Sequence, residues 1–133
     1  MITVSHEQVR LFRLAAIEYI KKFPDETKFK YSLEKVFERT TPVEGKWVDK
    51  LADIELDNAA TNELGIVQFT IDDQGKRVYS FTKDGLRKRD ADVNNEFKKP
   101  GVNEVEPFYT EDIPRDLHES WVNVFIPFVI EPN

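Results

Sequence analysis

The sequence predicts an α+β fold, and the evidence is a change in hydrophobic periodicity along the chain. Apolar residues recur at helical spacing through the N-terminal part, and then alternate with polar residues on either side of a glycine-containing turn. A highly charged, helix-like stretch follows. The chain has 133 residues, of which 40% are hydrophobic, and this is the length of one domain. We therefore expect residues 1–133 to form a single domain.

The first predicted helix covers residues 6–23. Ser5, followed three residues later by Gln8, forms a capping-box pattern at its start, and Pro24 ends it. The apolar stripe of this helix comprises Val9, Phe12, Ala16, Tyr19, Ile20 and Phe23.

Two shorter helices are predicted next, at residues 31–39 and 42–62. The break between them rests on Thr41, Pro42 and Glu44, which match an N-cap, an N1 proline and the acidic third position of a second capping box. Such a pattern favours a new helix over the continuation of the preceding one.

A β-hairpin is predicted at about residues 66–82. Residues 67–71 and 78–81 alternate between apolar and polar, and Gly75 in the intervening turn can adopt a positive φ. Because two strands alone are marginally stable in water, we expect the apolar face of the hairpin to pack on the helices.

A charged helix at residues 82–99 and an acidic, aromatic C-terminal segment at residues 101–133 complete the chain. Residues 115–130 fit a helix by one set of apolar positions and a strand by another, so both alternatives stay open. Pro114 could start a helix there, and Pro127 should stop one.

The net charge of −6 arises in the C-terminal segment. Residues 101–133 hold a single basic residue, Arg115, and seven of the 25 acidic residues, while the rest of the chain is balanced. Either the aromatic residues dock onto the domain and the acids are solvated, or both form a surface for a basic partner. The partner-binding residues that this second alternative predicts are Glu104, Glu106, Phe108, Tyr109, Glu111, Asp112, Trp121 and Phe125.

Basic side chains suggest a second possible surface, for phosphate or for an acidic partner. On the predicted charged helix this cluster comprises Lys83, Arg87, Lys88 and Arg89, and its alternative interpretation is an ordinary solvated helix face. Lys76 and Arg77 at the hairpin turn complete the possible basic surface.

Patterns typical of catalysis are missing from the sequence. The chain has no Cys, no glycine-rich nucleotide-binding loop, and two histidines, His6 and His118, far apart along it. The Asp72-Asp73 pair fits a turn, and Asp90 and Asp92 would face different ways on a helix. We therefore predict that the protein is not an enzyme and takes no cofactor or metal.

Residues 75–85 resemble the wing of PadR-like and MarR-like winged-helix regulators. In those proteins a basic tip leads into a Tyr-Ser-Leu-Thr strand and a glycine opens a dimerisation helix, as in Gly-Lys-Arg-Val-Tyr-Ser-Phe-Thr-Lys-Asp-Gly here. The resemblance implies that Lys76 and Arg77 would contact DNA and that the helix from Pro42 would read it.

A broader pattern resembles small accessory proteins of tailed phages. It comprises an Ala-rich helix end at residues 59–65, the acidic stretch Glu104-Val105-Glu106 and the apolar ending at residues 128–131. This resemblance implies a viral accessory protein, with no particular activity.

Together these observations predict a non-enzymatic protein-binding module of an accessory or inhibitor kind, whose partner is a protein with a basic surface. A winged-helix DNA-binding regulator and a structural subunit of a larger viral assembly are the alternatives. We find no signal peptide and no apolar stretch long enough for a membrane span, so we expect a cytoplasmic protein without membrane contact. The oligomeric state stays open.

Overall fold

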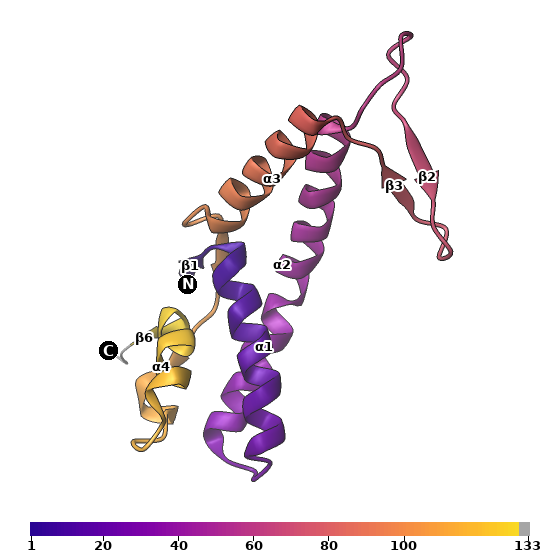
Figure 1. Ribbon diagram of the computed structural model, residues 1–133. Helices are drawn as coiled ribbons and strands as arrows, with labels where there is room; N and C mark the ends of the chain where they lie inside the picture. The colour runs from indigo at the N-terminus through magenta and orange to yellow at the C-terminus, as the bar shows by residue number, and fades with distance from the viewer. Residues whose placement is uncertain (131–133) are drawn as a thin grey trace. The chain divides into compact units, whose positions relative to one another are not determined.

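The computed structural model describes residues 1–130 and confirms the α+β class (Figure 1). The chain divides into two compact units, one formed by residues 1–45 together with the chain from Lys98 onward, and the other by residues 46–97. Helix α2 (Lys28–Asn58) contributes residues to both units. That the whole chain forms one domain stays a prediction.

The first unit contains helix α1 (His6–Lys22), which begins with the predicted capping box. The backbone N–H of Gln8 donates to Ser5 Oγ over 3.1 Å, and the backbone N–H of Ser5 donates to Gln8 Oε1 over 2.8 Å. A cap of this kind stabilises a helix by about 1 kcal/mol. The buried face of α1 includes Val9, Phe12, Ala16 and Tyr19, as the apolar stripe predicts.

Short strands tie the two ends of the chain into this unit. Strand β1 (Ile2–Val4) pairs antiparallel with β4 (Asn103–Val105), and β5 (Phe108–Tyr109) pairs in parallel with β6 (Val129–Ile130). Strands of two or three residues are too short to produce a recognisable alternation, so the sequence analysis missed both pairings.

The core of the first unit lies among α1, the N-terminal part of α2 and the C-terminal segment. The fully buried Phe12 ring of α1 contacts two rings of the C-terminal segment in it, with centroids 5.6 Å from Phe125 and 4.4 Å from Phe128. Aromatic contacts at these separations add to the stabilisation from burial. The other buried apolar residues of this core are Val4, Val9, Ala16, Tyr19, Phe29, Leu33, Val36, Val43, Val105 and Phe108.

The prediction of separate helices at residues 31–39 and 42–62 is wrong. Helix α2 runs unbroken from Lys28 to Asn58, and Pro42 lies inside it. Proline has no N–H to donate to the carbonyl of Glu38, and its ring crowds that carbonyl, so an interior proline normally breaks or kinks a helix.

Arg13 on α1 supplies hydrogen-bond donors to the turn before this proline. Its Nη1 donates to the carbonyl of Phe37 over 2.6 Å and to Thr40 Oγ1 over 2.8 Å. Thr40 Oγ1, which is fully buried, also donates to the Phe37 carbonyl over 2.8 Å. The Arg13 guanidinium lies 3.8 Å from the centre of the Phe37 ring. These contacts stabilise the helix at the position where the sequence pattern indicates a break.

The second unit comprises the C-terminal part of α2, the hairpin formed by β2 (Phe69–Ile71) and β3 (Arg77–Tyr79), and all of helix α3 (Lys83–Lys98) except its last residue. The Trp47 ring packs against Phe97, with 5.0 Å between centroids. A Cβ at Gly85 would lie 2.7 Å from the backbone oxygen of Asn58, so only glycine permits this close approach of α3 to α2.

The predicted hairpin is confirmed, with Phe69 opposite Tyr79 and Ile71 opposite Arg77. The expectation that its apolar face packs on the helices is wrong, because Phe69 is 41% exposed and Ile71 is 58% exposed. Part of this face is covered within the hairpin itself, since the Arg77 guanidinium lies 4.7 Å from the centre of the Phe69 ring. Helix α3 has no buried residue, which agrees with the charged, solvent-facing helix that its sequence predicts.

The C-terminal segment contains both of the alternatives that the sequence left open. Helix α4 (Glu119–Phe125) is followed by a 3-10 turn, η2 (Ile126–Phe128), and then by β6. Pro127 lies within that turn. Glu131, part of the acidic segment and of the phage-like ending, lies outside the described residues.

Candidate functional site

The acidic residues predicted to bind a partner are distributed over the first unit, and two of them contact α2. Glu104 is exposed on β4 between buried neighbours, and Glu111 is exposed in η1 (Thr110–Asp112). Glu106 Oε2 lies 3.5 Å from Arg39 Nη2. Asp112 Oδ2 accepts a hydrogen bond from Ser32 Oγ over 3.1 Å. The last two carboxylates therefore serve in part to attach the segment to α2.

Two of the predicted aromatic anchors are core residues. Phe108 is 4% exposed and Phe125 is 1% exposed, so neither ring can reach a partner, and we remove both from the predicted surface. Tyr109 is exposed, and Trp121 is half-buried against the core. Trp121 is therefore the predicted anchor that both packs on the protein and reaches its surface.

A pocket of about 200 Å³ surrounds Trp121. Its aromatic walls also include Tyr19 and Phe23, with ring centroids 5.5 Å between Tyr19 and Trp121 and 4.8 Å between Tyr19 and Phe23. Asp116 adds a carboxylate to the rim, and His118 adds an imidazole. The remaining lining residues are Pro114 and Leu117.

His118 caps a helix beside this pocket, and Tyr19 has a shifted pKa. His118 is the N-cap of α4, and its Nδ1 accepts a hydrogen bond from the backbone N–H of Ser120 over 3.1 Å. Burial raises the pKa of the Tyr19 hydroxyl, and the negative charge of Asp116 raises this pKa further. The pocket thus holds a neutral phenol and a carboxylate beside aromatic rings.

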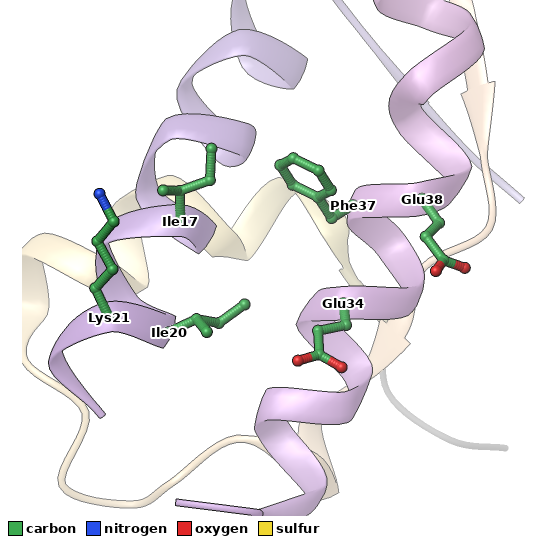
Figure 2. A pocket seen from close by; sticks show the side chains of 6 residues that line it. All are labelled: Ile17, Ile20, Lys21, Glu34, Phe37 and Glu38. Carbon is green, nitrogen blue, oxygen red and sulfur yellow. The ribbon is translucent and has the colours of Figure 1, made fainter. Parts of the chain in front are cut away.

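A second hollow lies between α1 and α2. Figure 2 shows Ile17 and Ile20 of α1 and Phe37 of α2 pointing toward the space between the helices. The hollow measures about 340 Å³. Its charged residues are Lys21 on the α1 wall, and Glu34 and Glu38 on the α2 wall.

This hollow continues into a neighbouring one of about 220 Å³, which shares Ile17 and Phe37 with it. There Arg10 Nη2 lies 3.1 Å from Glu44 Oε2, across the same two walls. We call the two hollows together the α1/α2 groove, lined by Arg10, Arg13, Leu14, Ile17, Ile20 and Lys21 of α1 and by Glu34, Phe37, Glu38 and Glu44 of α2.

The predicted basic residues all lie in the second unit. Lys76 and Arg77 are exposed in the hairpin, and Arg87 and Lys88 are exposed on α3. Arg89 instead pairs with Asp90, with 2.7 Å between Nη2 and Oδ1, so its charge is partly compensated.

The predicted structural roles of the aspartates agree with the hydrogen bonds of the second unit. Asp72 Oδ1 accepts hydrogen bonds from the backbone N–H groups of Gln74 and Lys76, as expected of a turn residue. Asp92 Oδ2 accepts from the Asn58 side chain. Within residues 1–130, no three His, Asp or Glu side chains gather in a way that could hold a metal ion.

The α1/α2 groove and the Trp121 pocket both include residues that the sequence patterns did not single out. Leu11, Leu14 and Ile17 follow one another at helical spacing on α1, and this second apolar stripe could have been recognised beside the core stripe. The meeting of Asp116 with Tyr19 and Phe23 had no such signal, because it joins positions far apart in sequence.

None of the helices in the described part of the chain, residues 1–130, has the length and apolar character needed to cross a membrane. No protein-family model matches the chain, and comparisons with curated proteins and with solved structures gave no match.

Proposed function

We propose that this protein is a non-enzymatic binding module that engages a basic protein surface, and that the pocket around Trp121 receives a lysine or arginine side chain of the partner. The observation that carries the proposal is the combination of three aromatic rings with one carboxylate, Asp116, around a pocket of about 200 Å³.

Aromatic rings attract cations through the negative potential of their faces, and Trp does so most strongly. A neighbouring carboxylate adds a charge-assisted hydrogen bond to a guanidinium or an ammonium. One of the three rings already takes part in such a contact within the chain, because Lys22 Nζ lies 5.8 Å from the centre of the Phe23 ring. An incoming cation would share this aromatic surface. The acidic surplus of the C-terminal segment would steer a basic partner toward it.

The proposal can be tested with an oligoarginine peptide as the probe and Trp121 fluorescence as the readout. A Trp47→Phe background removes the other tryptophan, which is buried against Phe97, and keeps an aromatic ring in its place. We expect saturable binding of oligoarginine and none of oligoglutamate. Asp116→Asn should weaken binding about tenfold, the equivalent of about 1.4 kcal/mol.

The matched control is Asp73→Asn, which removes one exposed carboxylate from the hairpin turn of the other unit. It should change the affinity by less than about twofold, because a distant surface charge is largely screened by salt. Equal affinities for the Asp116→Asn and Asp73→Asn variants would contradict the assigned site.

The winged-helix alternative gains support from the exposed hairpin, in which Lys76 and Arg77 are free of ion pairs among the described residues. It is opposed by the acids of the C-terminal part of α2, Asp49, Asp53 and Asp57, which would weaken phosphate contacts. Duplex DNA should bind in about 50 mM salt if this alternative holds, and binding should fall when Lys76 and Arg77 are replaced by alanine.

A further inference from the structure

We infer that the α1/α2 groove is an interface through which two copies of this chain associate. The groove and the Trp121 pocket lie on different sides of α1, so this inference goes beyond the proposed function and does not depend on it.

The first observation is a row of exposed apolar side chains on α1. Leu11 is 49% exposed, Leu14 is 58% exposed and Ile17 is 42% exposed, and their spacing places them on one side of the helix. The opposite side of α1 is the one that packs in the core. Single exposed apolar residues are normal in a soluble protein, whereas a continuous row beside a groove is typical of an interaction surface.

The second observation is that the two walls of the groove carry opposite charges, at two positions along the length of the groove. Lys21 on α1 lines the same hollow as Glu34 and Glu38 on α2, and Arg10 meets Glu44 farther along. Glu34 also lies 3.9 Å from Lys30. Lys21 and Glu38 take part in no ion pair within residues 1–130, and both are exposed.

These walls select a second copy as the occupant. A surface that packs on this face needs an apolar ridge, with a basic flank to meet the acids of α2, and α1 itself has both. A two-fold axis running along the groove keeps residues of the two copies at the same height. It sets α1 of one copy beside α2 of the other, in the manner of a four-helix bundle. Lys21 of each copy then faces Glu38 of the other copy.

Sedimentation velocity from about 1 µM to about 300 µM tests this association over the range in which weak dimers form. We expect the wild-type chain to dimerise with rising concentration. Lys21→Glu or Glu38→Lys alone should raise the dissociation constant at least about tenfold, because each substitution sets like charges face to face at both contacts. An equimolar mixture of the two variants should form a heterodimer, since both contacts then join opposite charges.

The mixture also shows that each variant is folded, because an unfolded chain could not restore association. Leu64→Asp is the control for a general loss of apolar surface, since Leu64 is 82% exposed outside the groove and this variant should dimerise normally. Asp116→Asn should dimerise normally as well, and Lys21→Glu should still bind oligoarginine, so the two proposals fail separately. A wild-type chain that stays monomeric over the whole range, or a mixture that stays monomeric, would overturn the inference.

Discussion

Replacing Pro42 by alanine should stabilise the protein. Inside a helix, proline costs about 3 kcal/mol relative to alanine through the lost hydrogen bond and the clash of its ring with the preceding turn. Alanine also gives the unfolded chain more conformational freedom, which lowers the free energy of unfolding by about 0.4 to 1 kcal/mol and offsets part of this gain. The donors from Arg13 and Thr40 hold this turn in helical geometry in the presence of the proline, which makes the gain smaller than this difference. We therefore expect a net gain of about 1 to 2 kcal/mol in the free energy of unfolding.

Urea denaturation followed by circular dichroism measures this gain. With a denaturant slope of about 2 kcal/mol/M, the middle of the usual range, the midpoint should rise by about 0.5 to 1 M. If a new helix began at Thr41, Pro42 would occupy the favoured N1 position, and alanine there would lower the midpoint instead. A lower midpoint for Pro42→Ala would therefore refute the continuous helix.

Thr41→Ala supplies an independent check on the same turn. Thr41 is exposed, and its Oγ1 accepts a 3.3 Å hydrogen bond from Arg13, so within a continuous helix its removal should change stability by less than about 0.5 kcal/mol. As the N-cap of a new helix it would instead stabilise the fold by about 1 kcal/mol. A loss of that size would agree with the capping-box pattern and contradict the structure.

Two further predictions concern the first unit. Arg13→Ala should lower the free energy of unfolding by about 1 to 3 kcal/mol, because the Phe37 carbonyl and Thr40 lose a charged donor. Urea denaturation should show this loss, and Arg13→Lys should recover only part of it. Because burial and Asp116 raise the pKa of Tyr19 in the folded state, its contribution to stability is complete below about pH 10 and is lost as the pH rises above that value. Urea midpoints at about pH 8 and about pH 10.5 should therefore fall less for Tyr19→Phe than for the wild type; equal falls would exclude Tyr19 as the cause.

Residue patterns were sufficient for α1, for the hairpin and for α3. The cap of α1 joins Ser5 to Gln8, and the hairpin turn places Gly75 at φ +77°. Each of these features depends on hydrogen bonds or on a periodicity that spans only a few residues, so the sequence contains the whole signal.

Long-range contacts decided the rest. Helix α2 continues through Pro42, and Arg13, distant in sequence, donates to the Phe37 carbonyl in the turn before it. Phe108 and Phe125 are aromatic residues of an acidic segment, and no local pattern separates a surface anchor from a core ring. The same holds for the α1/α2 groove, whose opposite charges belong to different helices. The burial of a ring, a hydrogen bond from Arg13 to α2 and the opposite charges of the groove each need a second segment of chain. Only the tertiary structure brings that segment into place.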